Sequence, residues 1–420
     1  MGSRRHARRR LGEGLVFLLT ADDHLVALDA ATGRLRWRIA VADPASGVYE
    51  TMAPLYAGGR VIVGSAGGDE GNRGFVAAFD ARSGRALWRF WTVPARGTLW
   101  VPRTGHHGGG AVWTTPTWDA ASHLILVPVG NPSPDYFGRG RPGPDPYTDS
   151  VAALDAATGR LAWYRQEVPH DLWDYDVASP PLLFTGPLGP EVAEAGKDGY
   201  LYAWRAATGA VAFRPVAFVR EGHAPPTRQG VIEWPGSLGG ANYGPSAYDG
   251  RLGLLFVAGI NGPTEVFAAR SLQPAAPLDF GTRGQSPPRS HWSGTITAVN
   301  AATGRIRWQV PTSTPPIGGV TATSGGLVVF GQESGRLTVL DARSGAELER
   351  LAAPGPIAAA PIVYERRGVI YVAVVTGGAL SLTASFPSHA PPELLVYRLA
   401  VTPAAARRRL ALGRVAGGGW

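Results

Sequence analysis

The sequence contains no cysteine, and this absence excludes several kinds of site at once. No disulfide, thiolate metal site or cysteine nucleophile can form, and no haem can be attached through a CxxCH motif. No apolar run reaches the roughly 18 residues that a membrane-spanning helix requires.

Charge of either sign is sparse in the body of the chain. Five arginines and Glu13 leave +4 in residues 1–14, and four arginines after residue 402 add +4, so these two ends account for the net charge of +8. A nucleic-acid-binding domain normally carries a basic stripe on its folded surface. We therefore expect no nucleic-acid partner, and we predict basic tails at 1–14 and 403–420 around a folded domain at 15–402. Residues 3–21 have the basic start and short apolar stretch of a weak export signal. Residues 15–30, which overlap this segment, fit two strands of a repeat equally well, and we favour the strands.

Glycine and proline, by contrast, are abundant, with 57 and 36 residues, which predicts frequent turns and short strands. The pattern A-x-D-x-x-T/S-G-x-x-x-W occurs at 27–37, 78–88 and 153–163, with weaker copies at 203–213, 298–308 and 339–349. Each copy predicts a β-hairpin whose Asp and Thr or Ser bond the turn backbone and whose Gly takes positive φ. With two more strands before each hairpin, the chain is expected to be an all-β propeller of about seven four-stranded units.

The tryptophan that closes the pattern has a structural explanation. It recurs at one place in the repeat, where a large side chain can pack between neighbouring sheets. We therefore assign Trp37, Trp88, Trp163 and Trp308 to stability.

Carboxylates are concentrated in the heptapeptide HDLWDYD at residues 170–176. If this segment is an extended strand, Asp174 and Asp176 leave on the same face while Trp173 and Tyr175 point away. Two like charges so close require a cation, a shared proton or open water. A polar loop flanked by two packing aromatics is the alternative.

The repeat, together with several local segments, resembles the quinoprotein alcohol dehydrogenases, the family of methanol, ethanol and glucose dehydrogenases. These are eight-bladed propellers that use pyrroloquinoline quinone (PQQ) and a metal ion. The likeness covers nearly the whole chain, and its local segments, in family order, are 64–80, 112–132, 170–176, 195–204 and 254–261. It implies a periplasmic enzyme that oxidises an alcohol or sugar and passes electrons to a separate cytochrome or quinone.

The resemblance also implies a role for each candidate residue. Trp113 would stack on the quinone, and Gly67, Lys197 and Asn261 would face it. Asp174 would be the general base, and Lys197 would stabilise charge on the reduced quinone. The ligands of a Ca²⁺ or lanthanide ion would be Asp69, Asn131, Asp174 and Asp176.

Scarcity supports three of these assignments. The 40 basic residues include a single lysine, Lys197, and Asn131 and Asn261 are two of only five asparagines. Solvent exposure is the ordinary alternative for the lysine, and a turn role for each asparagine.

Some features depart from the family and leave alternatives open. The family usually has Glu where Asp69 stands, and the adjacent Glu70 could reach the metal instead. Asp176 matches an extra ligand of lanthanide-using relatives, yet some glucose-oxidising relatives have a similar D-x-D. The family's first blade has no counterpart, so either the last unit closes a seven-bladed ring or edge strands stay exposed. A non-catalytic propeller scaffold for protein–protein interaction is the alternative function.

Overall fold

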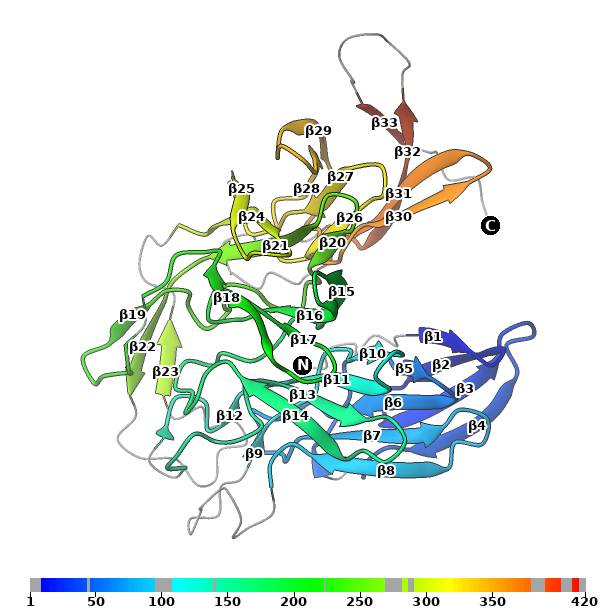
Figure 1. Ribbon diagram of the computed structural model, residues 1–420, viewed down its shortest axis with the longest axis vertical. Helices are drawn as coiled ribbons and strands as arrows, with labels where there is room; N and C mark the ends of the chain where they lie inside the picture. The colour runs from blue at the N-terminus through cyan, green and yellow to red at the C-terminus, as the bar shows by residue number, and fades with distance from the viewer. Residues whose placement is uncertain are drawn as a thin grey trace.

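The chain forms a series of four-stranded antiparallel sheets that follow one another around an open arc (Figure 1). The computed structural model describes residues 9–43, 46–94, 108–138, 141–222, 224–268, 282–285, 291–378, 390–401 and 410–414. Within these ranges there are seven such sheets, and strands pair in chain order inside each. The predicted all-β propeller of about seven units is confirmed.

The first four sheets lie between the amino end and residue 217. The first contains β1 (Arg9–Gly12), β2 (Leu15–Leu19), β3 (His24–Asp29) and β4 (Leu35–Ala40). The second contains β5 (Leu55–Ala57), β6 (Arg60–Gly64), β7 (Phe75–Asp80) and β8 (Ala86–Trp91). The third contains β10 (Thr117–Asp119), β11 (Leu124–Val129), β13 (Ser150–Asp155) and β14 (Leu161–Gln166). The fourth contains β15 (Leu182–Gly186), β16 (Gly189–Ala195), β17 (Tyr200–Arg205) and β18 (Val211–Ala217).

Three more sheets complete the arc. The fifth contains β20 (Ala247–Asp249), β21 (Leu254–Asn261), β24 (Ser293–Asn300) and β25 (Ile306–Thr312). The sixth contains β26 (Val320–Ala322), β27 (Leu327–Gly331), β28 (Arg336–Asp341) and β29 (Glu347–Ala352). The seventh contains β30 (Ile362–Arg366), β31 (Val369–Thr376), β32 (Glu393–Val401) and β33 (Leu410–Arg414).

Two small sheets project from the loops. One pairs β9 (Gly108–Gly109) with β12 (Pro132–Ser133). The other contains β19 (Val231–Glu233), β22 (Thr264–Ala268) and β23 (Thr282–Gln285).

The strands extend into both segments that the charge pattern predicted to be tails. Strands β1 and β33 are the outer strands of the first and seventh sheets, and both lie inside the segments expected to be tails. The first and seventh sheets stand at opposite ends of the arc and do not pair with each other in the described ranges (Figure 1). The alternative of a closed seven-bladed ring is therefore not seen.

The repeated hairpins have the predicted turn chemistry. In the first copy, Oδ1 of Asp29 accepts hydrogen bonds from the backbone N–H of Thr32 at 2.9 Å and from its hydroxyl at 2.8 Å. Gly33 follows with φ of 70°, where a side chain would be strained. The same side chain–hydroxyl bond recurs at Asp80, Asp155, Asn300 and Asp341.

The closing tryptophan links each sheet to the next. The indole N–H of Trp37 donates to the backbone carbonyl of Ala81 in the second sheet at 3.1 Å. A Cβ on Gly84, in the turn of that sheet, would lie 2.9 Å from the Trp37 ring, so only glycine allows this approach. The same contacts join Trp88, Trp163 and Trp308 to their next sheets, which confirms their predicted packing role.

Candidate functional site

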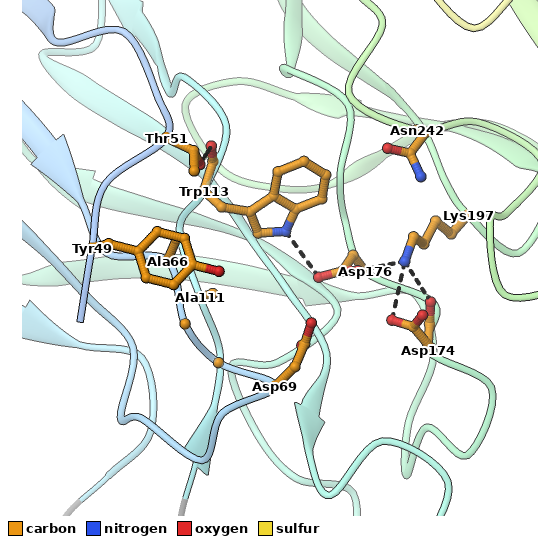
Figure 2. Close-up of a pocket in the computed structure, with 12 residues that line it drawn as sticks. Tyr49, Thr51, Ala66, Asp69, Ala111, Trp113, Asp174, Asp176, Lys197 and Asn242 are labelled. Atoms are coloured by element: carbon orange, nitrogen blue, oxygen red, sulfur yellow. Dashed lines mark hydrogen bonds and ion pairs between the residues drawn. The ribbon is translucent and has the colours of Figure 1, made fainter. Parts of the chain in front are cut away.

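Loops from the second to the fifth sheets, with the chain before them, enclose a pocket of about 260 Å³ (Figure 2). Some lining residues follow the second strand of a sheet, as Asp69 follows β6 and Lys197 follows β16. Others precede the first strand of a sheet, as Trp113 precedes β10 and Asp174 precedes β15. Because each sheet contributes at the same edge, residues far apart in the sequence meet here. The full lining is Tyr49, Thr51, Ala66, Gly67, Gly68, Asp69, Ala111, Trp113, Asp174, Asp176, Lys197 and Asn242.

Lys197 joins the two aspartates of the heptapeptide. Its Nζ donates to Oδ1 of Asp174 at 3.0 Å, to the backbone carbonyl of Asp174 at 2.8 Å and to Oδ2 of Asp176 at 2.6 Å. Burial alone would lower the pKa of Lys197, but the two carboxylates outweigh burial and raise that pKa. The two carboxylates thus favour the positively charged form of the lysine. It is 5% exposed, so the solvent-exposed alternative is not seen.

The heptapeptide is a loop with two packed aromatics, which is the alternative that the sequence left open, and it is not an extended strand. The carboxylate of Asp171 accepts hydrogen bonds from the backbone N–H groups of Trp173 and Tyr175, each at 2.9 Å, which folds the segment around that side chain. Asp174 then takes a φ of 63°, in the left-handed region. Asp174 and Asp176 still converge, as predicted, but through this turn rather than through a strand pleat. Both aromatics pack beside each other, with ring centroids 6.1 Å apart.

Asp176 points into the pocket. Its Oδ1 accepts hydrogen bonds from the indole N–H of Trp113 at 3.0 Å and from the backbone N–H of Asn131 at 3.2 Å. Gly130 lies against the same oxygen, because a Cβ there would meet it at 2.3 Å. Trp113, half-buried, is therefore held by its edge, with the rest of the ring bordering the pocket (Figure 2).

Asp69 faces the same space from the second sheet. Burial, followed by the negative charge of Asp176, raises the pKa of Asp69 to about 6, although Lys197 and a hydrogen bond from Asn131 act in the opposite direction. The neighbouring Glu70 is exposed and accepts a hydrogen bond from the Tyr49 hydroxyl at 3.3 Å. Of the two acids that the sequence left open, Asp69 lines the pocket.

Two asparagines differ from the sequence-based expectation. Asn261 is not among the lining residues, and its Oδ1 accepts a hydrogen bond from the backbone N–H of Arg220 at 2.9 Å. Asn242, which sequence analysis did not select, lines the pocket instead and donates to the carbonyl of Leu238 at 2.8 Å. The sequence offered one signal for Asn242, which is that asparagine is rare in this chain. Gly67 lies in the lining as expected, with φ of 85°.

The donors in the pocket fit a hard cation. Carboxylate and amide oxygens are the ligands that Ca²⁺ prefers, and Asp69, Asp174 and Asp176 supply carboxylates in the lining. Asn131, the predicted amide ligand, is buried and is not among the lining residues. Burial and then Asp176 and Asp69 raise the pKa of Asp174 against the opposing effect of Lys197, which shows that these acids repel one another. Within the described ranges, no three acidic or histidine side chains already form a ready metal cluster. Because Lys197 already contacts Asp174 and Asp176, a cation bound here would share these two carboxylates with it.

Known families match two parts of the chain. The family model described as the β-propeller domain of glucose, ethanol and alcohol dehydrogenases, named PQQ, matches residues 40–222. A model described as the outer membrane protein assembly factor BamB matches residues 293–385. The first match contains every lining residue of the pocket except Asn242.

Curated relatives match over most of this chain but are longer than it. The dehydrogenase subunit of a quinone-type alcohol dehydrogenase of Gluconacetobacter polyoxogenes is 31% identical over 87% of this chain and 58% of the relative. Quinohemoprotein alcohol dehydrogenase ADH IIB of Pseudomonas putida is 30% identical over 91% of this chain and 62% of the relative. A lanthanide-dependent methanol dehydrogenase of Methylorubrum extorquens is 28% identical over 87% and 70%, respectively. The chain thus spans about three fifths of the first two relatives.

Solved structures of alcohol and methanol dehydrogenases are also similar to this chain. The quinohemoprotein alcohol dehydrogenase from Comamonas testosteroni superposes with a TM-score of 0.84 at 25% identity, covering 95% of this chain and 68% of that one. A europium-containing methanol dehydrogenase superposes with a TM-score of 0.79 at 25% identity, covering 88% and 72%. Residues 40–222 thus match the PQQ β-propeller family, and most of the chain is similar in sequence and in fold to the quinoprotein alcohol dehydrogenases.

Proposed function

We propose that the pocket binds PQQ and a cation, and that the protein oxidises the hydroxyl group of an alcohol or a sugar. The observation that carries this proposal is the convergence of Asp174, Asp176 and Lys197 beside the half-buried ring of Trp113. A flat, anionic quinone requires an aromatic surface, a cationic group at its rim and a metal that joins it to protein carboxylates. The pocket contains each of these groups or the ligands for it.

The chain's own residues would hold the cofactor and the cation. Trp113 would stack against the quinone, and Gly67 would border it. The glycine is required by the protein's own packing, since a Cβ there would lie 2.9 Å from the Asn72 side chain. Asp69, Asn131, Asp174 and Asp176 would hold a Ca²⁺ or lanthanide ion. When bound, the quinone supplies a hydride acceptor and the metal supplies Lewis acidity.

Asp174 would take the proton from the substrate hydroxyl. Its side chain is 23% exposed and borders the pocket, so a substrate can reach it. Burial raises the pKa of Asp174, and a raised pKa makes its carboxylate a stronger base. The ammonium group of Lys197 acts in the opposite direction and favours the ionised form of the base. The same ammonium would stabilise negative charge on the reduced quinone.

The alternative function is a non-catalytic scaffold. The match to the assembly-factor model at 293–385 favours it for that part of the chain. However, the buried acids and the single lysine of the pocket lie before that segment, and protein–protein docking gives no reason to bury them together. We therefore retain the scaffold only as the alternative.

On the family resemblance, we also propose a periplasmic location and a separate electron acceptor, either a cytochrome or a quinone. No helix in the described ranges is long and apolar enough to cross a membrane.

One experiment tests the proposed activity. Purified protein is supplied with PQQ and either Ca²⁺ or La³⁺, and dye reduction is followed with a panel of alcohols and sugars. We expect quinone absorbance to stay with the protein and dye reduction to require both PQQ and a cation. Protein that retains neither the quinone nor the cation would support the scaffold instead.

A further inference from the structure

A buried arginine lies behind the heptapeptide loop, on the side away from the pocket lining. Arg141 is 3% exposed, and it is the only arginine of the described ranges that is fully buried. Removing a guanidinium group from water is costly unless its N–H groups find partners. The partners of Arg141 therefore indicate its role.

The guanidinium of Arg141 joins two loops through their backbone carbonyls. On its own loop, it donates to the carbonyls of Pro134 at 3.0 Å and Asp135 at 3.2 Å. On the heptapeptide loop, it donates to the carbonyl of Asp171. An ion pair with Asp145 compensates its charge, and both side chains are 2% exposed. One buried side chain thus holds the two loops together.

His170, the first residue of the heptapeptide, contacts the same neighbouring loop. Its backbone N–H donates to the carbonyl of Pro144 at 3.4 Å, and its Nδ1 lies 2.8 Å from the carbonyl oxygen of Gly143. A Cβ on Gly138 would lie 2.5 Å from Nε2 of His170, so the two loops are closely packed. The start of the heptapeptide is therefore fixed by residues that do not line the pocket.

The fixed start of the loop determines where Asp174 lies. The carboxylate of Asp171 accepts hydrogen bonds from the backbone N–H groups of Trp173 and Tyr175, which flank Asp174, each at 2.9 Å. Between them Asp174 takes a φ of 63° and borders the pocket. A series of hydrogen bonds that involve the backbone thus leads from Arg141 through Asp171 to the residues on both sides of Asp174.

We propose that Arg141 is a positioning residue, which holds the heptapeptide loop so that Asp174 is placed for proton transfer in the pocket. Such placement matters because a shift of about 1 Å in a reacting group can cost about 100-fold in rate. Arginine suits this role better than lysine, since its planar guanidinium donates to several acceptors in a fixed geometry. This inference rests on the proposed function, because Asp174 acts as a base only if the pocket oxidises a hydroxyl group.

The first measurement follows the loop without quinone, cation or substrate. Arg141→Lys keeps a positive charge beside Asp145, but an ammonium group cannot reproduce the guanidinium bonds to both loops. Amide hydrogen exchange of residues 170–176, measured by mass spectrometry, should become about 10-fold faster in this variant. That change is expected when one or two hydrogen bonds that oppose local opening are lost.

The second measurement follows the chemistry with PQQ and a cation. We expect Arg141→Lys to lower kcat by about 10- to 100-fold, the range typical of residues that orient a functional side chain. The KM for the alcohol should change little, because the substrate does not contact Arg141. Tb³⁺ titration of chelator-treated protein, with luminescence excited through tryptophan, shows separately whether the cation site is present.

The matched control is Arg165→Lys on β14. The guanidinium of Arg165 also donates to backbone carbonyls, those of Gly209 at 2.6 Å and Tyr164 at 3.0 Å, but neither belongs to the two loops. This control should leave exchange at 170–176 and kcat unchanged. A second variant, Arg141→Met/Asp145→Leu, removes the ion pair without leaving a buried charge and should reproduce the changes seen with lysine.

The possible failures are distinguishable. If the wild type binds no Tb³⁺ or oxidises none of the alcohols and sugars, the proposed function fails together with this inference. If the wild type is active and both Arg141 variants retain its kcat, only the positioning role is overturned, whether or not their loops exchange faster. If neither variant folds, Arg141 stabilises the fold rather than placing Asp174, which also overturns the inference.

Discussion

The Nζ atom of Lys197 lies 2.6 Å from Oδ2 of Asp176, and the two side chains are 6% and 7% exposed. The pair is therefore shielded from water. Charge interactions in such a buried environment are stronger than at the surface. The same ammonium group reaches Asp174 at 3.0 Å, so one cation serves two carboxylates. This leaves the pocket acidic overall, as expected for a site that receives a further cation.

Replacing Asp174 should separate chemistry from cofactor binding. We expect Asp174→Asn to lower dye-linked alcohol oxidation by about 100-fold or more, because the variant cannot take the substrate proton. The amide keeps an oxygen ligand and nearly the same shape, so PQQ should remain bound. Turnover is measured by dye reduction, and quinone content by absorbance. Wild-type turnover with full quinone and metal content would remove Asp174 from the mechanism.

Two tryptophans should behave in opposite ways. Trp163 is buried, and its indole N–H donates to the carbonyl of Ala206 at 3.0 Å in the next sheet, so Trp163→Ala should cost about 3–5 kcal/mol of unfolding free energy. Trp113 borders the pocket, so Trp113→Ala should weaken PQQ binding far more than it destabilises the fold. Denaturant unfolding and PQQ titration measure the two effects. Equal stability losses with unchanged PQQ affinity would show that Trp113 is also a packing residue.

Asp176 should determine the metal preference. Its carboxylate faces the pocket, so it adds an anionic oxygen that favours a cation of higher charge. We expect La³⁺ to activate the protein at least as well as Ca²⁺, and Asp176→Ala to reverse that order. Metal titrations of chelator-treated protein, with activity as the readout, compare the two variants. Identical responses to both metals in wild type and variant would exclude Asp176 as a ligand.

Cation binding should weaken as the pH falls through about 6, the pKa to which burial and Asp176 raise Asp69. Below this pH, Asp69 holds a proton that the cation must displace. The same shift means that the folded protein retains this proton more strongly than the unfolded chain, whose carboxyl has the usual pKa of 3.8. Stability of the metal-free protein should therefore fall as the pH rises from about 4 to 6.

Asp69→Asn tests both effects through Tb³⁺ affinity and thermal melting between pH 4 and 7. In the variant, Tb³⁺ affinity should no longer weaken as the pH falls through about 6. Its melting temperature should no longer fall as the pH rises from about 4 to 6. If its profiles match those of the wild type, the titrating group lies elsewhere.

The sequence predicted the repeats well because their signals are local. Asp29, Thr32 and Gly33 specify one turn by contacts within four residues, and a tryptophan at fixed spacing specifies the next contact. Most of the pocket could be located only through the family resemblance, because its residues come from different sheets.

The remaining differences depend on tertiary contacts. The loop form of residues 170–176 is set by Asp171, whose role cannot be seen in an alternation of polar and aromatic residues. Asn242 and Asp135 follow turn-like, glycine- or proline-rich segments, in which either residue type is unremarkable. Only the folded chain shows that Asn242 lines the pocket and that Asp135 is buried.

The most direct test of the central claim is equilibrium dialysis of PQQ against the purified protein with and without a cation. The account predicts that one quinone binds per chain when Ca²⁺ or La³⁺ is present. It predicts that binding falls sharply with chelator and in a folded Asp174→Asn/Asp176→Asn double variant, which removes two of the three acids that line the pocket. Quinone binding that is the same with cation, with chelator and in the double variant would contradict the account.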